Sequence, residues 1–421
     1  MVYPRRQFIK TLFPASFCFC TFSSCSKQKS PDYNIKILTT GPRHHFFGYY
    51  GICPWNKKGD KIISLQCSFQ DHMPLPDEPA TIGLVDTETG KFTKVSETHA
   101  WNFQQGAMLH WHPKYPDSQI IFNDREGKEI ISVVLDINTG EKRVLPRPVN
   151  AISHNGKYAL CLTYGRLGRL RKVVGYAGIE DPNPNHPHPA DDGVFFMDIQ
   201  TGKIKLIVSF NQVYDILAER LDGLKDKHLW FNHVVFNKSD TRLFFLARMR
   251  KPGAGFETGM FTVNTDGSEL REVIPFGTSV SHFDWRNDEE IIATFKFNGP
   301  NRVHVLFTDG RNDYKQLGEG NLDFDGHCSF APAQNWLVTD CKLKATIEQA
   351  IMIYNVETGQ FRELGRFDMR NKKFISGDLR CDFHPRWNRT GDQICFDGID
   401  SRDGTRQLHI VKLNNFISEF I

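Results

Sequence analysis

One short phrase recurs seven times along the chain, and it restricts the possible folds more than any other feature. In each copy an aromatic or apolar anchor precedes a polar turn and then an apolar strand, as in the run from Trp55 to Ile63. The anchors lie about 40 to 57 residues apart, with one wider gap near the middle. Strand-forming repeats of this length are typical of β-propellers, in which each repeat forms one blade. The anchors are Trp55, Trp111, Ile152, Phe236, Trp285, Phe330 and Trp387.

A second phrase supports this interpretation, because in six repeats an apolar strand ends in a tight turn that contains glycine. Glycine supplies the left-handed backbone conformation that such a turn needs between the third and fourth strands of a blade. Together the two phrases predict an all-β, seven-bladed β-propeller. The six turn phrases begin at Val85, Leu135, Met197, Val263, Phe307 and Tyr354.

The last repeat lacks one strand, since the chain ends after predicted strands at about 380–387, 392–397 and 407–413. The segment from Ile35 to Leu38 is predicted to supply the missing strand and to close the ring, which would remove free sheet edges. The wide gap holds the Gly- and Arg-rich run 165–171, the Pro-rich run 181–189 and a predicted helix over 212–224. Insertions of this kind in a compact ring are usually functional loops, the alternative being a solvated decoration.

The N-terminal residues are predicted to be an export signal and a tether, outside the folded domain. Residues 1–25 contain Arg5-Arg6, as in twin-arginine export signals, and end at Cys25 after small residues, as at a lipoprotein cleavage site. A plain secretory signal is the alternative. We therefore predict an exported protein, a periplasmic or cell-surface lipoprotein held by a lipid anchor, with residues 26–33 as a tether and residues 34–421 as the propeller.

Composition excludes several classes of partner and of scaffold. The net charge of +3 gives no field for binding nucleic acid. Seven of the ten cysteines follow the leader and form no C-x-x-C pair, so a disulfide framework is not expected. We expect a monomer.

Four histidines occupy the same place in four consecutive repeats, three residues before the anchor. Side chains alternate along a strand, so an equal offset predicts an equal direction, toward the axial channel. Converging imidazoles are typical of a divalent metal site, for which we favour zinc over manganese or calcium, with Asp325, Cys381 and Asp382 as nearby partners. The alternative is that each histidine bonds the backbone of a neighbouring blade. The predicted ligands are His233, His282, His327 and His384.

The first three repeats carry a different set of polar and aromatic residues near the predicted strand ends. Histidine, tyrosine and arginine in such positions indicate a site for an acidic ligand rich in hydroxyl groups. We expect one end of the ring to gather His45, Tyr49, Tyr50, His99, His110, Tyr164, Arg166 and Tyr176.

Several of these phrases resemble those of the seven-bladed propeller polysaccharide lyases, which include oligogalacturonate lyase and the propeller-type ulvan lyases. The resemblance implies β-elimination on glycans that contain uronate, and a divalent metal held by histidines at the propeller axis. The phrases are 44–50, 104–106, 232–233, 281–282, 325–327 and 382–387.

The resemblance also implies roles for residues of the first three repeats. His99 or His110 would be the base, Tyr164 the proton donor and Arg166 the group that neutralises the substrate carboxylate. The chain lacks the cluster of ligands on one loop that oligogalacturonate lyase has, which favours an ulvan-like and sulfated glycan over pectin. The expected substrate-binding residues are His45, Tyr49, Tyr50, Gln105 and Tyr176.

The chemistry of elimination suits these residue types. Arginine or a metal ion can stabilise the charge that develops on a uronate carboxylate, and a neutral imidazole can then remove the C5 proton. A glycoside hydrolase would need two opposed carboxylates, and no such pair stands out. The competing class is a non-catalytic propeller lipoprotein that binds glycan or takes part in envelope assembly.

Overall fold

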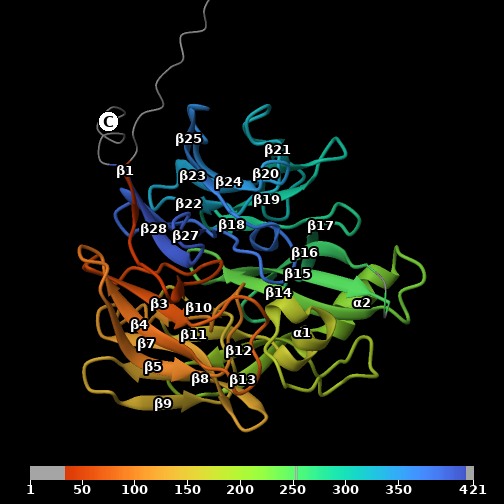
Figure 1. The fold of residues 1–421 in the computed structure, drawn as a ribbon. Helices are drawn as coiled ribbons and strands as arrows, with labels where there is room; N and C mark the ends of the chain where they lie inside the picture. The colour runs from red at the N-terminus through yellow and green to blue at the C-terminus, as the bar shows by residue number, and fades with distance from the viewer. Residues whose placement is uncertain (1–33, 252, 254, 414–421) are drawn as a thin grey trace, which may run out of the picture. The chain divides into compact units, whose positions relative to one another are not determined.

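Seven four-stranded antiparallel sheets make up the fold of this computed structural model, which describes residues 34–251, 253 and 255–413 (Figure 1). The sheets are the blades of a β-propeller, as the repeats predict. The predicted export signal and tether lie outside the described residues. No helix among the described residues is long and apolar enough to cross a membrane.

In the first three blades, as in the next three, the strands follow one another in chain order from the inner strand to the outer one. Blade one contains β2 (His44–Phe46), β3 (Lys61–Cys67), β4 (Ala80–Asp86) and β5 (Phe92–Thr98). Blade two contains β6 (His110–Trp111), β7 (Gln119–Glu126), β8 (Glu129–Asp136) and β9 (Lys142–Leu145). Blade three contains β10 (Ala151–Ile152), β11 (Tyr158–Cys161), β12 (Gly193–Asp198) and β13 (Ile204–Ser209).

Blades four to six repeat this order. Blade four contains β14 (His228–Phe236), β15 (Arg242–Arg250), β16 (Glu257–Asn264) and β17 (Arg271–Ile274). Blade five contains β18 (Phe283–Trp285), β19 (Glu290–Lys296), β20 (Arg302–Thr308) and β21 (Lys315–Gln316). Blade six contains β22 (Ser329–Phe330), β23 (Trp336–Leu343), β24 (Glu348–Asn355) and β25 (Phe361–Asp368).

Blade seven closes the ring with strands from both ends of the described chain. It contains β26 (Arg386–Trp387), β27 (Gln393–Ile399), β28 (Arg406–Lys412) and, at its outer edge, β1 (Asn34–Ile37). Ile35 pairs with Val411 and Ile37 with His409, and the backbone N–H of Leu38 donates to Leu408 O at 2.7 Å. The predicted closing strand is therefore confirmed.

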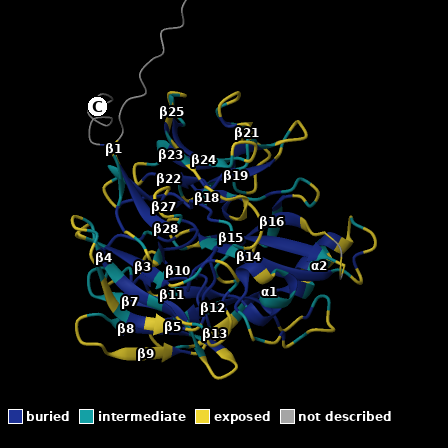
Figure 2. Ribbon diagram, in the orientation of Figure 1, coloured by how far each residue is buried: buried dark blue, intermediate teal, exposed yellow. Residues whose placement is uncertain are grey.

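The anchors join each blade to its neighbour. The indole Nε1–H groups of Trp111, Trp285 and Trp387 donate to the carbonyls of Pro54, Val235 and Ser329, each in the preceding blade. The polar turns add bonds of the same kind. The core consists of these inner and middle strands, whereas outer strands such as β9 are largely exposed (Figure 2).

The inner strand of blade one is interrupted, and this interruption shapes the channel. After β2 the chain leaves the ladder at Phe47 and rejoins it at Trp55, which forms an isolated bridge with Ile62. Gly51, with φ of +70°, turns the chain within this excursion. The interruption places Tyr49 and Tyr50 among the side chains of the channel.

The wide gap between the third and fourth anchors holds two insertions, one within blade three between β11 and β12 and one between blades three and four, and it is more helical than the sequence predicts. The run predicted to be an irregular loop forms α1 (Tyr164–Leu170) and the 3-10 helix η1 (Lys172–Val174). It folds in spite of two glycines because Tyr164, Leu167 and Leu170 are buried in an apolar cluster. The helix predicted over 212–224 is present as α2 (Phe210–Ala218), shifted toward the N-terminus because Ser209 and Gln212 form a capping box. A further 3-10 helix, η2 (Lys372–Phe374), precedes blade seven.

Removing residues 34–39 should lower the melting temperature by several degrees, because the deletion exposes the edge of β28 and the buried Leu38. Differential scanning calorimetry would measure the shift. The control is Lys36→Ala, which keeps the strand and alters a half-buried side chain on its surface. A deletion variant that melts with the wild type would contradict closure by β1.

Candidate functional site

A cavity of about 210 Å³ at one end of the channel gathers all four histidines of the repeat register. We call it the histidine cavity. Besides the histidines it is lined by two tyrosines, one carboxylate and four arginines, which come from blades one, three, four, five and seven. These lining residues are Tyr49, Tyr50, Arg171, His233, Arg248, His282, Arg302, His327, Arg380, Asp382 and His384.

His327 is held in a fixed orientation by a buried carboxylate. Its Nδ1–H donates to Asp340, with both carboxylate oxygens at 2.9 Å, and its backbone N–H donates to Asp340 Oδ1 at 2.7 Å. Gln349 donates to the other oxygen of Asp340 at 2.8 Å. Because Nδ1 carries the proton, Nε2 has its lone pair free for a ligand.

His327, Asp382 and His384 form a group that can hold a metal ion, since one potential ligand atom of each lies within 4.8 Å of the others. All three are buried, and Nδ1 of His384 has no hydrogen-bond partner. Burial, followed by the nearby His327, lowers the pKa of His384 well below its usual value. A neutral imidazole with an unsatisfied buried nitrogen is suited to coordinating a cation.

Asp382 is ionised in this setting. Burial acts to raise its pKa, but Arg380 and Lys342 outweigh burial and hold the pKa well below the usual range. Arg380 Nε donates to Asp382 Oδ2 at 2.8 Å, and Lys342 Nζ donates to Oδ1. The carboxylate therefore faces His327 Nε2, at 3.8 Å, as an anion.

His282 lies beside this group but has a partner of its own. Its ring centroid is 4.0 Å from that of His327, and its Nδ1–H donates to Asp325 Oδ1 at 2.7 Å. Asp325 also accepts from Thr294 at 2.6 Å and from Arg302 at 2.8 Å. Burial acts to raise the pKa of Asp325, but His282 and Arg302 lower it below its usual value. His282 Nε2 is thus left toward the cavity, as in a histidine–carboxylate dyad.

His233 departs from the other three because a bulge interrupts β14 between Asn232 and Val235. Its φ is +58°, and that of His384 is +42°, values that are strained for a residue with a side chain. The ring of His233 stacks on Tyr49 with centroids 5.1 Å apart, and its Nδ1 forms a short hydrogen bond with the Tyr49 hydroxyl. The four histidines share the offset of three residues before the anchor, but they are not four equivalent candidate ligands, because His233 is turned toward Tyr49.

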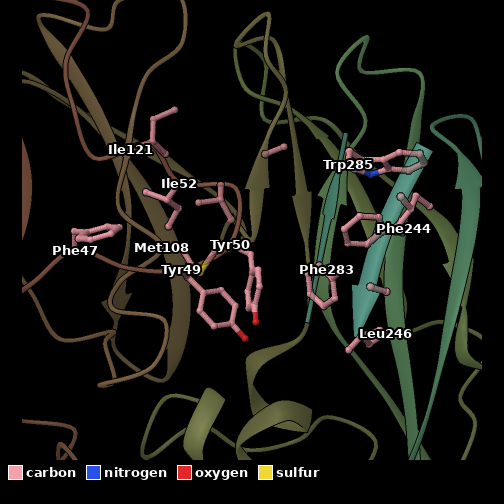
Figure 3. Packing of buried hydrophobic residues seen from close by; sticks show 14 of the residues in the cluster. Phe47, Tyr49, Tyr50, Ile52, Met108, Ile121, Phe244, Leu246, Phe283 and Trp285 are labelled. Carbon is pink, nitrogen blue, oxygen red and sulfur yellow. The ribbon is translucent and has the colours of Figure 1, made fainter. Parts of the chain in front are cut away.

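Tyr50 closes the floor of the cavity. Its ring lies 4.5 Å from Phe283 and 5.3 Å from the Arg386 guanidinium. Figure 3 shows the hydroxyl groups of Tyr49 and Tyr50 pointing away from Ile52 and Trp285. The Tyr50 hydroxyl is buried without a partner, and burial raises its pKa well above the usual value.

Two arginines of the cavity lack a carboxylate partner among the described residues. The guanidinium groups of Arg171 and Arg248 lie 5.0 and 5.1 Å from the Phe256 ring centroid, and the Nε atom of each is buried without a hydrogen-bond partner. Burial, followed by the charge of Arg171, lowers the pKa of Arg248 to about 9. These two cations are available to an anionic ligand.

The predicted bases of blade two lie away from this cavity. His99 is exposed between β5 and β6. His110 is buried in β6, lines a different pocket at the opposite end of the channel, and has its pKa lowered to about 4 by burial. The structure therefore does not place either histidine beside the four of the register.

The predicted acid and carboxylate neutraliser are structural. Tyr164 is buried, and its hydroxyl bonds Asn150 at 3.1 Å; burial raises its pKa well above the usual value. Arg166 is 1% exposed and donates to the backbone carbonyls of Pro187 in the insertion and of Leu229 in β14, both at 2.6 Å. These donors tie the insertion to β14, and the structure does not bring Arg166 into the histidine cavity.

Three of the five predicted substrate-binding residues are buried in the protein interior and do not line the histidine cavity. His45 is buried between Gln407 and Gln66, at 2.9 and 2.8 Å. Tyr176 stacks on Tyr164 with centroids 4.1 Å apart, and Gln105 is buried, its backbone N–H bonded to Asn102. Tyr49 and Tyr50 do line the cavity, so the structure unites them with the histidines and not with blades two and three.

The sequence interpretation missed the arginines. Arg248 comes from β15, Arg302 from β20, Arg171 from the turn between α1 and η1, and Arg380 from the segment before blade seven. A signal was present for Arg248, because cations alternate with apolar residues near the end of an otherwise apolar strand. For Arg171 and Arg380 the register offers no signal, since both lie outside strands.

Comparison with known proteins gives a match at the level of fold. No protein-family model matches the sequence, and no curated protein is significantly similar to it. A structure of oligogalacturonate lyase in complex with manganese is 16% identical, with a TM-score of 0.64 over 91% of this chain and 94% of that chain. The oligogalacturonate lyase of Vibrio parahaemolyticus is 13% identical, with the same TM-score and coverage.

A prolyl endopeptidase is a more distant match, at 6% identity and a TM-score of 0.52 over 88% of this chain and 47% of that chain. At these identities the likeness concerns the fold and not the activity. This chain thus has the seven-bladed propeller fold that oligogalacturonate lyase also has.

Proposed function

We propose that this protein is a metal-dependent polysaccharide lyase that cleaves a uronate-containing glycan by β-elimination. The observation that carries the proposal is the histidine cavity, where a group able to hold a metal ion lies beside two arginines without a carboxylate partner. The likeness in fold to oligogalacturonate lyase supports it. An ulvan-like, sulfated glycan is the substrate that the sequence resemblance favours.

The cavity residues fit a divalent cation. Two buried imidazoles and one ionised carboxylate form a donor set that suits manganese or zinc, and Nδ1 of His384, which has no partner among the described residues, is free to coordinate. His327, His384 and Asp382 would hold the ion, with His282 adjacent. When bound, it would act as a Lewis acid toward the uronate carboxylate. Zinc was favoured from sequence, and the fold neighbour in complex with manganese makes manganese an equal candidate.

In this proposal the roles of base and acid belong to residues of the histidine cavity, in place of the residues predicted in blades two and three. His282, oriented by Asp325, presents Nε2 as the base that removes the C5 proton. Tyr49 would donate its proton to the departing glycosidic oxygen, with His233 orienting the phenol. The C5–H and C4–O bonds break, a C4–C5 double bond forms, and no water is consumed.

The carboxylate neutraliser would be the pair Arg171 and Arg248 in place of Arg166. Charge must be stabilised as the C5 proton leaves, and buried guanidinium groups without a carboxylate partner do this with little reorganisation. The same two guanidinium groups could also neutralise the negative charge of a sulfate ester.

The cellular setting remains part of this proposal. The Arg5-Arg6 pair and Cys25 support export and a lipid anchor, which would place a monomeric enzyme where acidic polysaccharides are met. Export in the folded state would suit a protein that acquires its metal before crossing the membrane.

Tyr49→Phe should lower the turnover rate by about a hundredfold or more, because it removes the proposed proton donor and keeps the ring. The measurement is the ultraviolet absorbance of unsaturated uronate ends released from a panel of uronate polysaccharides. The matched control is Tyr164→Phe, which removes a buried hydroxyl outside the cavity and should leave turnover unchanged. Loss in the control alone would return the acid role to Tyr164.

His327→Ala should abolish metal binding, and Asp340→Asn should weaken it by about ten- to a hundredfold by releasing the His327 ring. Elemental analysis of the purified protein and competition with a chelating dye provide the two readouts. His99→Ala, at an exposed position outside the cavity, is the control. Wild-type protein that binds neither manganese nor zinc would exclude the metal-dependent mechanism.

The alternative is a non-catalytic glycan-binding propeller with the same cavity. It would bind uronate oligosaccharides, lose that binding in Arg248→Met, and release no unsaturated ends. This outcome, with normal metal content, would replace the lyase proposal.

A further inference from the structure

A second pocket lies at the end of the channel opposite to the histidine cavity. It has a volume of about 510 Å³, and Tyr50 is the one residue that lines both sites. We call it the anchor pocket, because its walls are apolar residues at or near the repeat anchors. These wall residues are Ile52, Trp111, Ile152, Phe236, Phe330 and Trp387.

A buried cation that forms no ion pair with a carboxylate of the described residues lines this pocket, which has both apolar and polar walls. Arg386 is 5% exposed; its Nε donates to Tyr49 O at 3.2 Å, and its Nη1 donates to Pro385 O at 3.3 Å. Its Nη2 atom is buried without a partner, and no carboxylate of the described residues forms an ion pair with it. Asp284, also in the lining, accepts a hydrogen bond from the Phe330 backbone at 2.8 Å. Burial lowers the pKa of Arg386, and Asp284 is the carboxylate that acts most strongly against this, although the two side chains form no ion pair.

A second buried polar atom lines the same pocket. His110 is 7% exposed, its Nε2 has no hydrogen-bond partner, and burial lowers its pKa to about 4, so the ring is neutral at pH 7. A buried donor or charge left without a partner is costly, and such groups are usually matched by a ligand, water or ion. The charges at the mouth, Lys238 and Arg389, are also positive.

We propose that the anchor pocket binds a small organic carboxylate with an apolar body, its carboxylate on Arg386 and His110 and its body against Trp387 and Phe330. A planar guanidinium matches a carboxylate in shape and charge. The aromatic walls match an apolar body, which a bare inorganic anion lacks. This proposal does not depend on the lyase activity, because the two sites open at opposite ends of the channel.

The test compares 3-phenylpropionate with its neutral amide and with inorganic phosphate, by calorimetric titration of the intact protein. We expect the carboxylate to bind, and the amide and phosphate to bind at least about tenfold more weakly. Equal affinity for carboxylate and amide, or no binding of the carboxylate, would overturn the proposal. Tighter binding of phosphate than of 3-phenylpropionate would also overturn it.

Arg386→Met should weaken binding of 3-phenylpropionate by at least about thirtyfold, because the carboxylate loses its buried cation. The matched control is Arg248→Met, the same change in the histidine cavity, which should leave this affinity unchanged. Metal content is measured in both variants, since Arg386 is close to His384 in sequence.

Two further variants keep the proposal testable if Arg386→Met does not fold. Ile152→Trp fills the pocket from a half-buried wall position, and His110→Phe removes only the imidazole nitrogens. Both should weaken binding of 3-phenylpropionate. Wild-type affinity in these folded variants would show that the carboxylate binds elsewhere.

Discussion

Closure of the ring is the constraint on which every other feature depends. β1 completes the sheet that begins at β26, so blade seven has four strands like the other six blades. Indole donors from three anchors then tie neighbouring blades together. Because the inner strands meet at one axis, residues from blades one, four, five, six and seven that are up to about 335 positions apart become neighbours.

The histidine cavity brings four imidazoles and four guanidinium groups into a small volume. Burial and then the charge of Arg248 lower the pKa of His233 and favour its neutral form, but the four guanidinium groups that line the same space repel one another. Carboxylates resolve part of this conflict, since Asp325, Asp340 and Asp382 are paired with His282, His327 and Arg380. What remains without a partner, notably the Nε atoms of Arg171 and Arg248, identifies where a ligand is needed.

The fold could be predicted from sequence because the repeated anchors and glycine turns mark where each strand begins and ends. The number of blades and the closing strand follow from that pattern. The site could be predicted only in part. The offset of three residues located the four histidines, but a bulge redirected His233. Arg166 and Arg248 are both buried, and they differ in that backbone carbonyls accept from Arg166, whereas Nε of Arg248 has no partner among the described residues. The positions of Tyr164 and Arg166 could not be predicted, because residue type does not reveal whether a hydroxyl or guanidinium group lines a channel or forms hydrogen bonds within the packed interior.

The interrupted strand of blade one has a consequence for how a polymer can approach. Tyr50 lines both sites and packs against Phe283, so its ring lies between the histidine cavity and the anchor pocket. With this ring in place, we expect a glycan to enter and leave the histidine cavity by the same mouth. The end of a glycan chain or a short oligosaccharide could enter such a cavity directly, whereas an internal segment of a long glycan would have to bend sharply to reach Tyr50.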